Sequence, residues 1–337
     1  MPSSNKDLVL AVDIGGTKIA ATIAGRNGKR MGRTTAIPTP QTGSASEWIS
    51  SVGEALHDIV RHSGYSDRFA GVYYSTVGPM REVAGGLRIF PPNIAPLRQV
   101  GLHYPAMLSE VLGLPFGFDN DGNTALAAEV LDAKGAAAGA ENAAVLVWSS
   151  GVGCGFYSQG KLLHFEARDP VTWADPALSD VVRNSFEVGH VFVEGTSAKL
   201  QCGDGAWGHL EAHLGGKAAE ERHEIPKESH ARFMEAGRQY LPQALAMPLQ
   251  QYGIDLVVVT GALGKALLNE HPEFAGELSD AFAQGAGGHA VAFKASAIDN
   301  ASLRGAQLLG LQALERDTFV VPAHSASQNS STGLAGP

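Results

Sequence analysis

The most constraining feature of this chain is a glycine-rich turn that occurs twice, each time directly after a short apolar run. The first copy lies within Leu8-Val-Leu-Ala-Val-Asp-Ile-Gly-Gly-Thr-Lys18, and the second lies within Ala143 to Gly155. Each copy continues into a second apolar run that closes on a turn ending in Gly-Lys, at residues 26–29 and 158–161. Asn-Gly in the first closing turn is a strong hairpin signal, and Gln-Gly in the second is a weaker one. The repeat predicts two similar lobes that face a shared cleft.

Glycine at such turns lets backbone N–H groups approach a bound anion, and successive N–H groups form a concavity that favours phosphate. Two such turns facing one cleft suggest one bound nucleotide. The residues alone also allow a second interpretation, in which Gly15, Gly16, Gly151, Gly153 and Gly155 serve only tight hairpins. Neither segment fits the Walker pattern or the three spaced glycines of a Rossmann fold, so those two nucleotide folds are poor fits.

Composition narrows the class of protein. A chain of 337 residues exceeds the usual domain size, and a prior of roughly 150 residues per domain gives two domains. The net charge of -9 argues against nonspecific nucleic-acid binding. Cys154 and Cys202 form no disulfide framework, and we find no secretory signal and no apolar run of membrane-spanning length. We expect a soluble, cytoplasmic protein with neither nucleic acid nor membrane as a partner.

Hydrophobic periodicity gives the order of secondary structure along the chain. It predicts helices over residues 46–62, 104–112, 120–131, 228–251 and 301–314, and strands over residues 69–74, 115–118, 143–148, 256–259 and 289–295. A stretch rich in Gly and Pro, up to Pro96, is expected to be a loop, and residues 318–337 are expected to form a disordered tail. Alternating strands and helices around a repeated glycine hairpin predict an α/β fold of two related lobes.

Four segments that carry polar, chemically useful side chains occur in a fixed order: Asp13 to Lys18, Phe118 to Glu129, Phe186-Glu-Val-Gly-His190 and Cys202 to Glu211. Together they resemble the ROK family of sugar kinases and repressors, over roughly residues 7–315. The resemblance implies the duplicated actin-like, ribonuclease-H-like ATPase fold, with ATP and a sugar in the central cleft. It implies a smaller lobe at residues 1–117 plus a C-terminal helix at about 301–316, and a larger lobe at residues 118–300.

The resemblance makes Asp121 the catalytic base for transfer of the γ-phosphoryl group to a sugar hydroxyl. The chemistry agrees, because a carboxylate between a strand end and a helix N-terminus is fixed in place and stays ionised. Phosphoryl transfer depends mainly on positioning and charge stabilisation, so a base of ordinary acidity suffices. Taken alone, Asn120 and Asp121 could equally be residues that only cap the helix.

The resemblance also implies a set of sugar ligands. Polar side chains that donate and accept hydrogen bonds suit a polyol. The matching positions are Asn120, Asp121, Glu187, His190 and Glu211, joined by Asn93 and, in the loop beneath it, Gly78.

For Mg²⁺-ATP, the resemblance makes Asp13 the acid that approaches the metal ion, through water, because Mg²⁺ tends to keep its hydration shell. The positions expected near the nucleotide are Gly15, Gly16, Thr17 and Lys18 in the first turn, Ser150, Gly151 and Gly153 in the second, and Gly261 and Gly264 beside the adenosine. Lys18 could equally be a solvated hairpin lysine. Ser149-Ser150 stands where the family usually has Gly-Thr, and a serine hydroxyl can still donate to phosphate.

The chain departs from the family at the metal site. The family commonly holds a structural Zn²⁺ with one histidine and three cysteines, whereas this chain keeps His190 and Cys202 and has Asp204 and His209 in place of two cysteines. Aspartate and histidine both bind zinc, so a tetrahedral site is feasible. The alternative is a metal-free loop held by hydrogen bonds and by packing of Trp207.

A second departure is the stretch from Leu162 to Ser185, which is longer than the family's usual link, with Phe186 where a glycine normally precedes the glutamate. It enters beside the expected sugar pocket, so it could alter specificity or cover the site. It could equally be a surface insertion, because long loops are tolerated.

The leading interpretation is an ATP-dependent kinase for the 6-hydroxyl of a hexose, with glucose first and N-acetylmannosamine or N-acetylglucosamine as the alternative. A non-catalytic sugar-binding regulator is a more distant possibility, since binding alone would require neither Asp13 nor Asp121. A repressor is nearly excluded, because only about seven residues precede the first predicted strand, against the helix-turn-helix domain that the family's repressors carry. Polyphosphate is an alternative donor that would favour a basic groove. The resemblance suggests a homodimer.

Overall fold

The computed structural model describes residues 6–83, 86–167, 182–184, 187–193, 200–202, 205–223, 226, 228–285 and 289–322. The chain divides into two compact units. The first unit takes the chain up to Asn120 and again from Ala306, and the second unit is Asp121–Gly305. The chain therefore passes from the first unit to the second between the two residues of the predicted Asn120-Asp121 pair.

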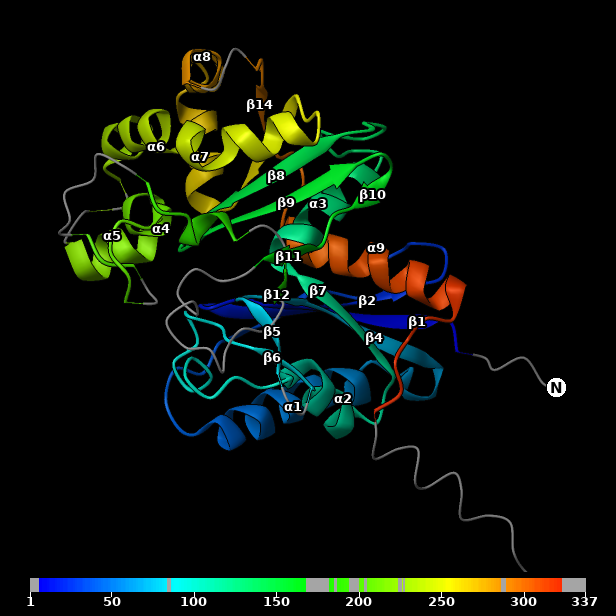
Figure 1. The fold of residues 1–337 in the computed structure, drawn as a ribbon. Helices are drawn as coiled ribbons and strands as arrows, with labels where there is room; N and C mark the ends of the chain where they lie inside the picture. The colour runs from blue at the N-terminus through cyan, green and yellow to red at the C-terminus, as the bar shows by residue number, and fades with distance from the viewer. Residues whose placement is uncertain are drawn as a thin grey trace, which may run out of the picture. The chain divides into compact units, whose positions relative to one another are not determined.

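The first unit is built on a five-stranded sheet with the order β3-β2-β1-β4-β7 (Figure 1). Its strands are β1 (Leu8–Ile14), β2 (Lys18–Gly25), β3 (Thr35–Pro38), β4 (Phe69–Thr76) and β7 (Phe116–Asn120). β1 and β2 form an antiparallel hairpin around the first glycine turn, and β1 also pairs in parallel with β4. The predicted hairpin thus opens a mixed sheet.

Helices cover both faces of this sheet (Figure 1). They are α1 (Ala45–His62) and α2 (Tyr104–Leu112) on one face and α9 (Ala301–Arg316) on the other. Successive strand residues point to opposite faces, so Leu8 and Leu10 pack with α1 and α2, whereas Val9 packs with Leu311 of α9. α1 begins at a capping box that Ser44 forms with the third residue of the helix.

The second unit repeats this plan. Its sheet has the order β10-β9-β8-β13-β14, formed by β8 (Ala143–Trp148), β9 (Val152–Ser158), β10 (Lys161–Leu162), β13 (Leu256–Thr260) and β14 (Ala292–Ala295). β8 is antiparallel to β9 and parallel to β13, as β1 is to β2 and β4. The expectation of a duplicated α/β fold is therefore confirmed.

The helices of the second unit again lie on both faces of the sheet (Figure 1). α3 (Asp121–Leu131) packs on the face that carries Val145, and α6 (His230–Gln251), α7 (Ala262–Glu270) and α8 (Phe274–Gly285) pack on the face that carries Leu146 and Trp148. Two short helices, α4 (Leu210–Leu214) and α5 (Gly216–His223), precede α6.

Hydrophobic periodicity did not predict several of the secondary-structure elements. The stretch expected to be a loop contains the hairpin of β5 (Met80–Val83) and β6 (Gly86–Ile89), whose strands are too short to show alternation. The short helices α4, α5, α7 and α8 were also not predicted. The remaining short elements are η1 (Ser66–Arg68), β11 (Phe165–Ala167), β12 (Val182–Asn184) and η4 (Val188–His190).

The predicted tail was wrong in its first residues. The Thr318 N–H donates to the Ala313 carbonyl at 3.0 Å, and Phe116 and Val320 exchange two backbone hydrogen bonds of 2.8 Å each. Phe319 packs in the small cluster that includes Val9 and Leu311. The chain after α9 therefore adds to the edge of the first sheet, and residues 323–337 lie outside the described part of the chain.

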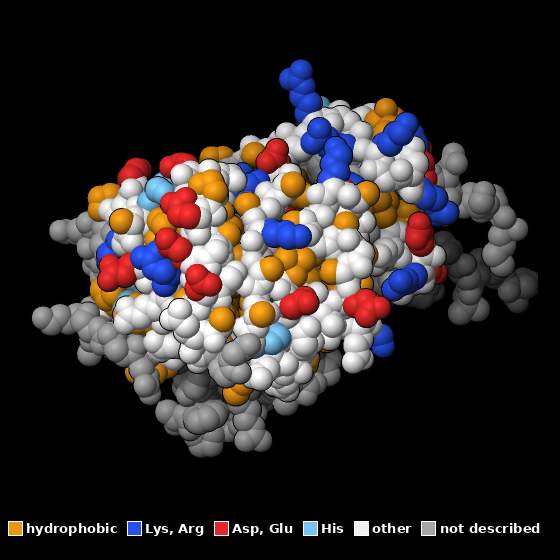
Figure 2. Space-filling model, turned by 90° about the horizontal axis from the view of Figure 1, so that it is seen from above, with side chains coloured by type: hydrophobic (Ala, Val, Ile, Leu, Met, Phe, Trp, Pro, Cys, Tyr) orange, Lys and Arg blue, Asp and Glu red, His pale blue; other side chains and the backbone are white. Residues whose placement is uncertain are grey.

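Three further observations concern surface charge, the hydropathy of the helices and the two cysteines. Figure 2 shows acidic and basic side chains intermixed over much of the face it presents, with basic side chains more frequent at the upper right of the view. Within the described ranges, no helix combines the length and the apolar character needed to cross a bilayer. Cys154 and Cys202 are both free and buried.

Candidate active site

Asp121, the predicted base, is the first residue of α3 and directly follows β7. One carboxylate oxygen, Oδ1, accepts a hydrogen bond of 2.9 Å from the Gly122 N–H at the start of the helix. A Cβ placed on Gly153 would lie 3.8 Å from the same oxygen. Asp121 is therefore anchored at a helix N-terminus, which favours its negative charge, and it lies beside the second glycine turn.

Gly153, the last residue of this turn, and Gly155 after it differ in why the position is occupied by glycine. A Cβ on Gly155 would lie 2.5 Å from the Gly122 carbonyl oxygen, so packing of α3 on β9 requires a glycine there. A Cβ on Gly153 would meet nothing closer than Val147 at 3.7 Å, an ordinary contact. Packing within the protein does not explain Gly153, whereas close approach of a ligand to the backbone would.

Two backbone N–H groups after α4 hold the second turn, a third position approaches it closely, and all three were missed by the sequence analysis. The Gly216 N–H donates to the Ser149 carbonyl, and the Lys217 N–H donates to the Ser150 carbonyl, both at 2.9 Å. A Cβ on Gly215 would lie 3.2 Å from the Ser150 carbonyl oxygen. The adjacent glycines of Gly215-Gly216-Lys217 were the signal that could have found them, since such pairs mark close backbone approach.

The sugar-ligand positions of the second unit converge on the same turn. Glu211, on α4, is buried, and its Oε2 accepts a hydrogen bond of 3.2 Å from the Val152 N–H. A Cβ on Gly189 would lie 2.5 Å from the Val152 carbonyl oxygen and 3.3 Å from Glu211 Oε2. The short helix η4, which Glu187 precedes and His190 ends, therefore packs directly against Val152 and Glu211.

The predicted zinc ligands His190, Cys202 and His209 are close together. His190 Nδ1 lies 3.8 Å from Cys202 Sγ, and one ligand atom from each of the three residues lies within 4.8 Å of the other two. Two imidazoles and a thiol form a donor set that suits Zn²⁺. Asp204, the fourth predicted ligand, lies outside the described residues. Trp207 is 51% exposed, which gives little support to the alternative in which its packing holds a metal-free loop.

The other cysteine has no such surroundings. Cys154 lies on β9 with its thiol fully buried among apolar side chains, and this burial raises the pKa of the thiol far above its usual range. Metals bind the thiolate, so Cys154 is not a ligand candidate.

Gly261 and Gly264, expected beside the adenosine, pack against the strand that leads into the second turn. Gly261 has a φ of 87°, and a Cβ there would lie 2.4 Å from the Trp148 carbonyl oxygen. A Cβ on Gly264 would lie 2.9 Å from the Trp148 Cβ. Both positions therefore require glycine to bring the start of α7 against β8.

In the first unit, the glycine turn is held by a neighbouring loop. The Gly15 N–H donates to the Lys18 carbonyl at 3.0 Å, and the Thr39 hydroxyl donates to the Gly15 carbonyl at 2.6 Å. A Cβ on Gly16 would lie 2.7 Å from the Asn93 Cβ, so this turn packs against a predicted sugar ligand. Lys18 and Thr17 are exposed beyond the turn, and Asp13, at the end of β1, is half-buried.

Gln41 connects the first turn to the loop that carries Asn93, a contact that the sequence analysis missed. Its side-chain amide donates to the Gly16 carbonyl at 2.5 Å, and its side-chain oxygen accepts from the Ala95 N–H at 3.2 Å. No local pattern marks this residue, because its partners are far along the chain on both sides.

The remaining sugar-ligand positions of the first unit lie at the ends of strands. Gly78 has a φ of 95°, and a Cβ there would lie 2.6 Å from both the Phe90 carbonyl oxygen and the Pro91 Cα. The loop at Gly78 therefore lies directly against the segment that precedes Asn93. Asn120 is buried at the end of β7, where it pairs with Thr76 of β4.

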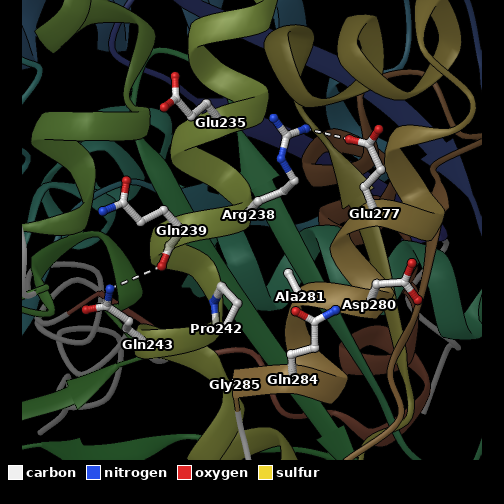
Figure 3. A pocket seen from close by; sticks show the side chains of 10 residues that line it. All are labelled: Glu235, Arg238, Gln239, Pro242, Gln243, Glu277, Asp280, Ala281, Gln284 and Gly285. Carbon is white, nitrogen blue, oxygen red and sulfur yellow. Dashed lines mark hydrogen bonds and ion pairs between the residues drawn. The ribbon is translucent and has the colours of Figure 1, made fainter.

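A cavity of about 670 Å³ lies between α6 and α8. Figure 3 shows the residues that line it, which are Glu235, Arg238, Gln239, Pro242, Gln243, Glu277, Asp280, Ala281, Gln284 and Gly285. Arg238 is paired with Glu277 at 2.5 Å, so the cavity offers an excess of acidic side chains. It contains none of the predicted site residues, and its charge does not suit a nucleotide.

Comparison with known proteins agrees with this architecture. Residues 9–166 match the ROK family. An N-acetylmannosamine kinase of Shigella flexneri is 32% identical over 157 residues, which cover 46% of this chain and 49% of that protein. The chain thus spans about half the length of the curated relatives it matches.

Solved structures extend the similarity in fold over most of the chain. A ROK hexokinase from Thermus thermophilus superimposes with a TM-score of 0.65 and 25% identity, covering 92% of this chain and 99% of that one. A ROK family glucokinase from Streptomyces griseus, in complex with glucose and AMPPNP, superimposes with a TM-score of 0.62 and 21% identity. The match covers 90% of this chain and 99% of that one. The N-terminal half of this chain therefore matches the ROK family, and the fold over most of the chain is similar to that of a ROK hexokinase.

Proposed function

We propose that this chain is an ATP-dependent sugar kinase that transfers the γ-phosphoryl group of ATP to the 6-hydroxyl of a hexose. The observation that carries the proposal is the placement of Asp121 at the start of α3, beside the Ser149–Gly153 turn that Glu211 and residues 215–217 support. A fixed carboxylate next to a glycine turn unites a base and a phosphate-binding segment in one unit.

Asp121 acts as the general base in this proposal. Its Oδ1 is oriented by the Gly122 N–H, and the helix N-terminus stabilises the ionised form. The carboxylate takes the proton of the attacking hydroxyl, whose oxygen bonds to the γ-phosphorus as the bond from that phosphorus to the leaving ADP oxygen breaks. Positioning and charge stabilisation supply most of the rate in such transfers, so a base of ordinary acidity suffices for this role.

Sugar binding is assigned to polar side chains of both units. Glu187, His190 and Glu211 in the second unit, and Asn93 and Asn120 in the first, offer the donors and acceptors that a polyol requires. The close packing of Gly16 on Asn93 supports the assignment of Asn93, and the contacts of Glu211 with Val152 and with η4 support that of Glu211.

The nucleotide is assigned to the two glycine turns. Thr17 and Lys18 are exposed at the first turn, and Ser150, Gly151 and Gly153 belong to the second. Gly261, which caps the N-terminus of α7, packs against β8. Asp13 would approach Mg²⁺, which neutralises phosphate charge when bound. Polyphosphate is a less favoured donor, because the net charge of -9 disfavours binding of a long polyanion.

Zinc is proposed as a structural ion held by His190, Cys202 and His209, with Asp204 as the proposed fourth ligand. Cys202 Sγ also lies 3.9 Å from Glu211 Oε1, so an ion there would order the loop next to a sugar ligand. Purified protein should contain zinc that Cys202→Ser removes and that Cys154→Ala retains. Equal zinc in all three proteins would contradict this ligand set.

The sugar itself has two candidates. A hexose such as glucose is supported by the hexokinase from Thermus thermophilus, which is similar over most of the chain. An N-acetylhexosamine is supported by the N-acetylmannosamine kinases, which are 32% and 33% identical over the N-terminal half. The stretch from Leu162 to Ser185 lies mostly outside the described residues, and its effect on specificity remains a prediction.

ADP release, measured with Mg²⁺-ATP and a panel of glucose, mannose, fructose, N-acetylglucosamine and N-acetylmannosamine, tests the proposal. Turnover with a single sugar class supports the kinase and names the substrate. Sugar binding without ADP release from any sugar would instead indicate a binding or regulatory protein. We further propose a cytoplasmic homodimer, which light scattering of the purified chain would test.

A further inference from the structure

A second group of metal-binding side chains lies where the start of α6 meets the end of α7. His230 is the first residue of α6, Glu270 is the last residue of α7, and His271 caps α7. His230 Nδ1 lies 3.4 Å from Glu270 Oε2, and the two imidazole rings are edge to face with centroids 5.5 Å apart. One ligand atom from each residue lies within 4.8 Å of the other two.

We propose that His230, Glu270 and His271 form a binding site for Zn²⁺ that is separate from the His190, Cys202 and His209 group. Two imidazole nitrogens and one carboxylate oxygen are a donor set that zinc accepts, with one position left for water or a fourth ligand. Mg²⁺ and Ca²⁺ prefer oxygen ligands, so the two imidazoles favour a transition metal over these ions.

The surroundings of the group also favour a cation. Glu273 contributes a further carboxylate, with its Oε1 3.7 Å from His271 Nδ1, which places a potential fourth ligand beside the group. The carbonyl groups at the end of α7 carry partial negative charge directed toward this position. The side chain of His230 is 20% exposed and that of Glu270 is 62% exposed, so an ion can enter from solvent.

The two metal groups differ in chemistry as well as in place. The group that includes Cys202 carries a thiol and lies against Glu211 of the candidate active site. The group at His230 has no sulfur, and it joins the first residue of α6 to the last residue of α7, which lies forty residues later in the sequence. An ion at His230 would therefore fasten the start of α6 to the end of α7, the helix whose N-terminus Gly261 caps.

Zinc stoichiometry of chelator-stripped protein, titrated against a chromophoric zinc chelator, tests the site. His271→Ala should lower the zinc bound by one equivalent relative to wild type, and His230→Ala should do the same. His57→Ala, which removes an exposed histidine of α1, is the matched control and should leave the stoichiometry unchanged. Unchanged zinc binding in His271→Ala, or an equal loss in His57→Ala, would overturn the proposal.

Cobalt substitution separates the two groups without relying on a variant of the active-site region. Co²⁺ bound near Cys202 gives a thiolate-to-metal charge-transfer band, whereas a sulfur-free site gives only d–d bands. In His271→Ala, one equivalent of Co²⁺ should be lost with the charge-transfer band retained. Loss of that band together with the equivalent would place the metal at Cys202 and contradict a second site.

Discussion

The two glycine turns share a sequence pattern, yet the chain holds them in different ways. In the first unit, the Thr39 hydroxyl donates to the Gly15 carbonyl and the Gln41 side-chain amide donates to the Gly16 carbonyl, beside one backbone hydrogen bond from the Thr39 N–H to the Thr17 carbonyl. In the second unit, backbone N–H groups of Gly216 and Lys217 donate to the turn. The two units therefore share the hairpin, but different residues hold the glycine turn in each.

This difference matters because the residues that hold each turn connect it to different candidate site residues. Gln41 connects the first turn to the loop of Asn93, whereas the second turn is connected through Val152 to the Glu211 carboxylate and lies beside Asp121. We therefore expect changes at the second turn to affect catalysis, and changes at the first to affect ligand binding more than chemistry.

The largest effect is expected from Asp121→Asn. The amide oxygen can still accept the Gly122 N–H, so the helix start is kept, but the base is lost and turnover should fall by about 10²–10⁴-fold. The melting temperature should change little. Asp299→Asn, at an exposed position, serves as the control and should retain full activity. Turnover by Asp121→Asn equal to wild type would show that Asp121 only caps α3.

Glu211→Ala should come next. It leaves the buried Val152 N–H without its acceptor, which costs about 1–3 kcal/mol, and it removes a proposed sugar ligand. We expect kcat/KM for the sugar to fall by about 10- to 100-fold and the denaturation midpoint to drop. Glu211→Gln, which keeps an acceptor oxygen, should restore stability while leaving sugar binding impaired. Full catalytic recovery in Glu211→Gln would argue that Glu211 has only a structural role.

A matched pair of glycine substitutions sharpens the contrast between packing and function at the second turn. Gly155→Ala places a Cβ 2.5 Å from the Gly122 carbonyl oxygen and should destabilise the fold by about 1–3 kcal/mol. Gly153→Ala meets only ordinary contacts, so its stability should stay within about 0.5 kcal/mol of wild type. We expect Gly153→Ala to raise KM for ATP several-fold despite that stability. Unchanged ATP kinetics would remove Gly153 from the nucleotide site.

The smallest effect is expected from Gln41→Ala in the first unit. It removes two exposed hydrogen bonds that connect the first turn to Ala95, each contributing about 0.5–1.5 kcal/mol. Steady-state kinetics should show KM values raised by about three- to tenfold with kcat nearly unchanged. A large loss of kcat with unchanged KM would contradict the assignment of the first turn to binding.

Local sequence patterns predicted the elements in which hydrophobic periodicity and glycine turns agree. The helix at Trp48, the strand at Val145 and the strand-to-helix step at Asp121 all carry their signal within a few residues. The duplicated fold followed from the repeated hairpin, whereas the grouping of Glu187, His190 and Glu211 came from the resemblance to the ROK family and stays a prediction.

The contacts that the sequence patterns did not predict are formed between residues distant in the sequence. Gln41 gains its place only when the folded chain brings Gly16 and Ala95 to it. The hydrogen bonds between Phe116 and Val320 override a polar composition typical of a disordered tail, because a sheet edge is available to pair with. Such contacts arise from tertiary structure and leave no mark in a short window of sequence.

The most direct test of the central claim follows the phosphoryl group itself. Protein incubated with the turnover-supporting sugar and ATP labelled at the γ-phosphate should yield labelled sugar 6-phosphate, and Asp121→Asn should yield almost none. Label that appears only as inorganic phosphate, or equal label on the sugar from Asp121→Asn and wild type, would contradict sugar phosphorylation with Asp121 as the base.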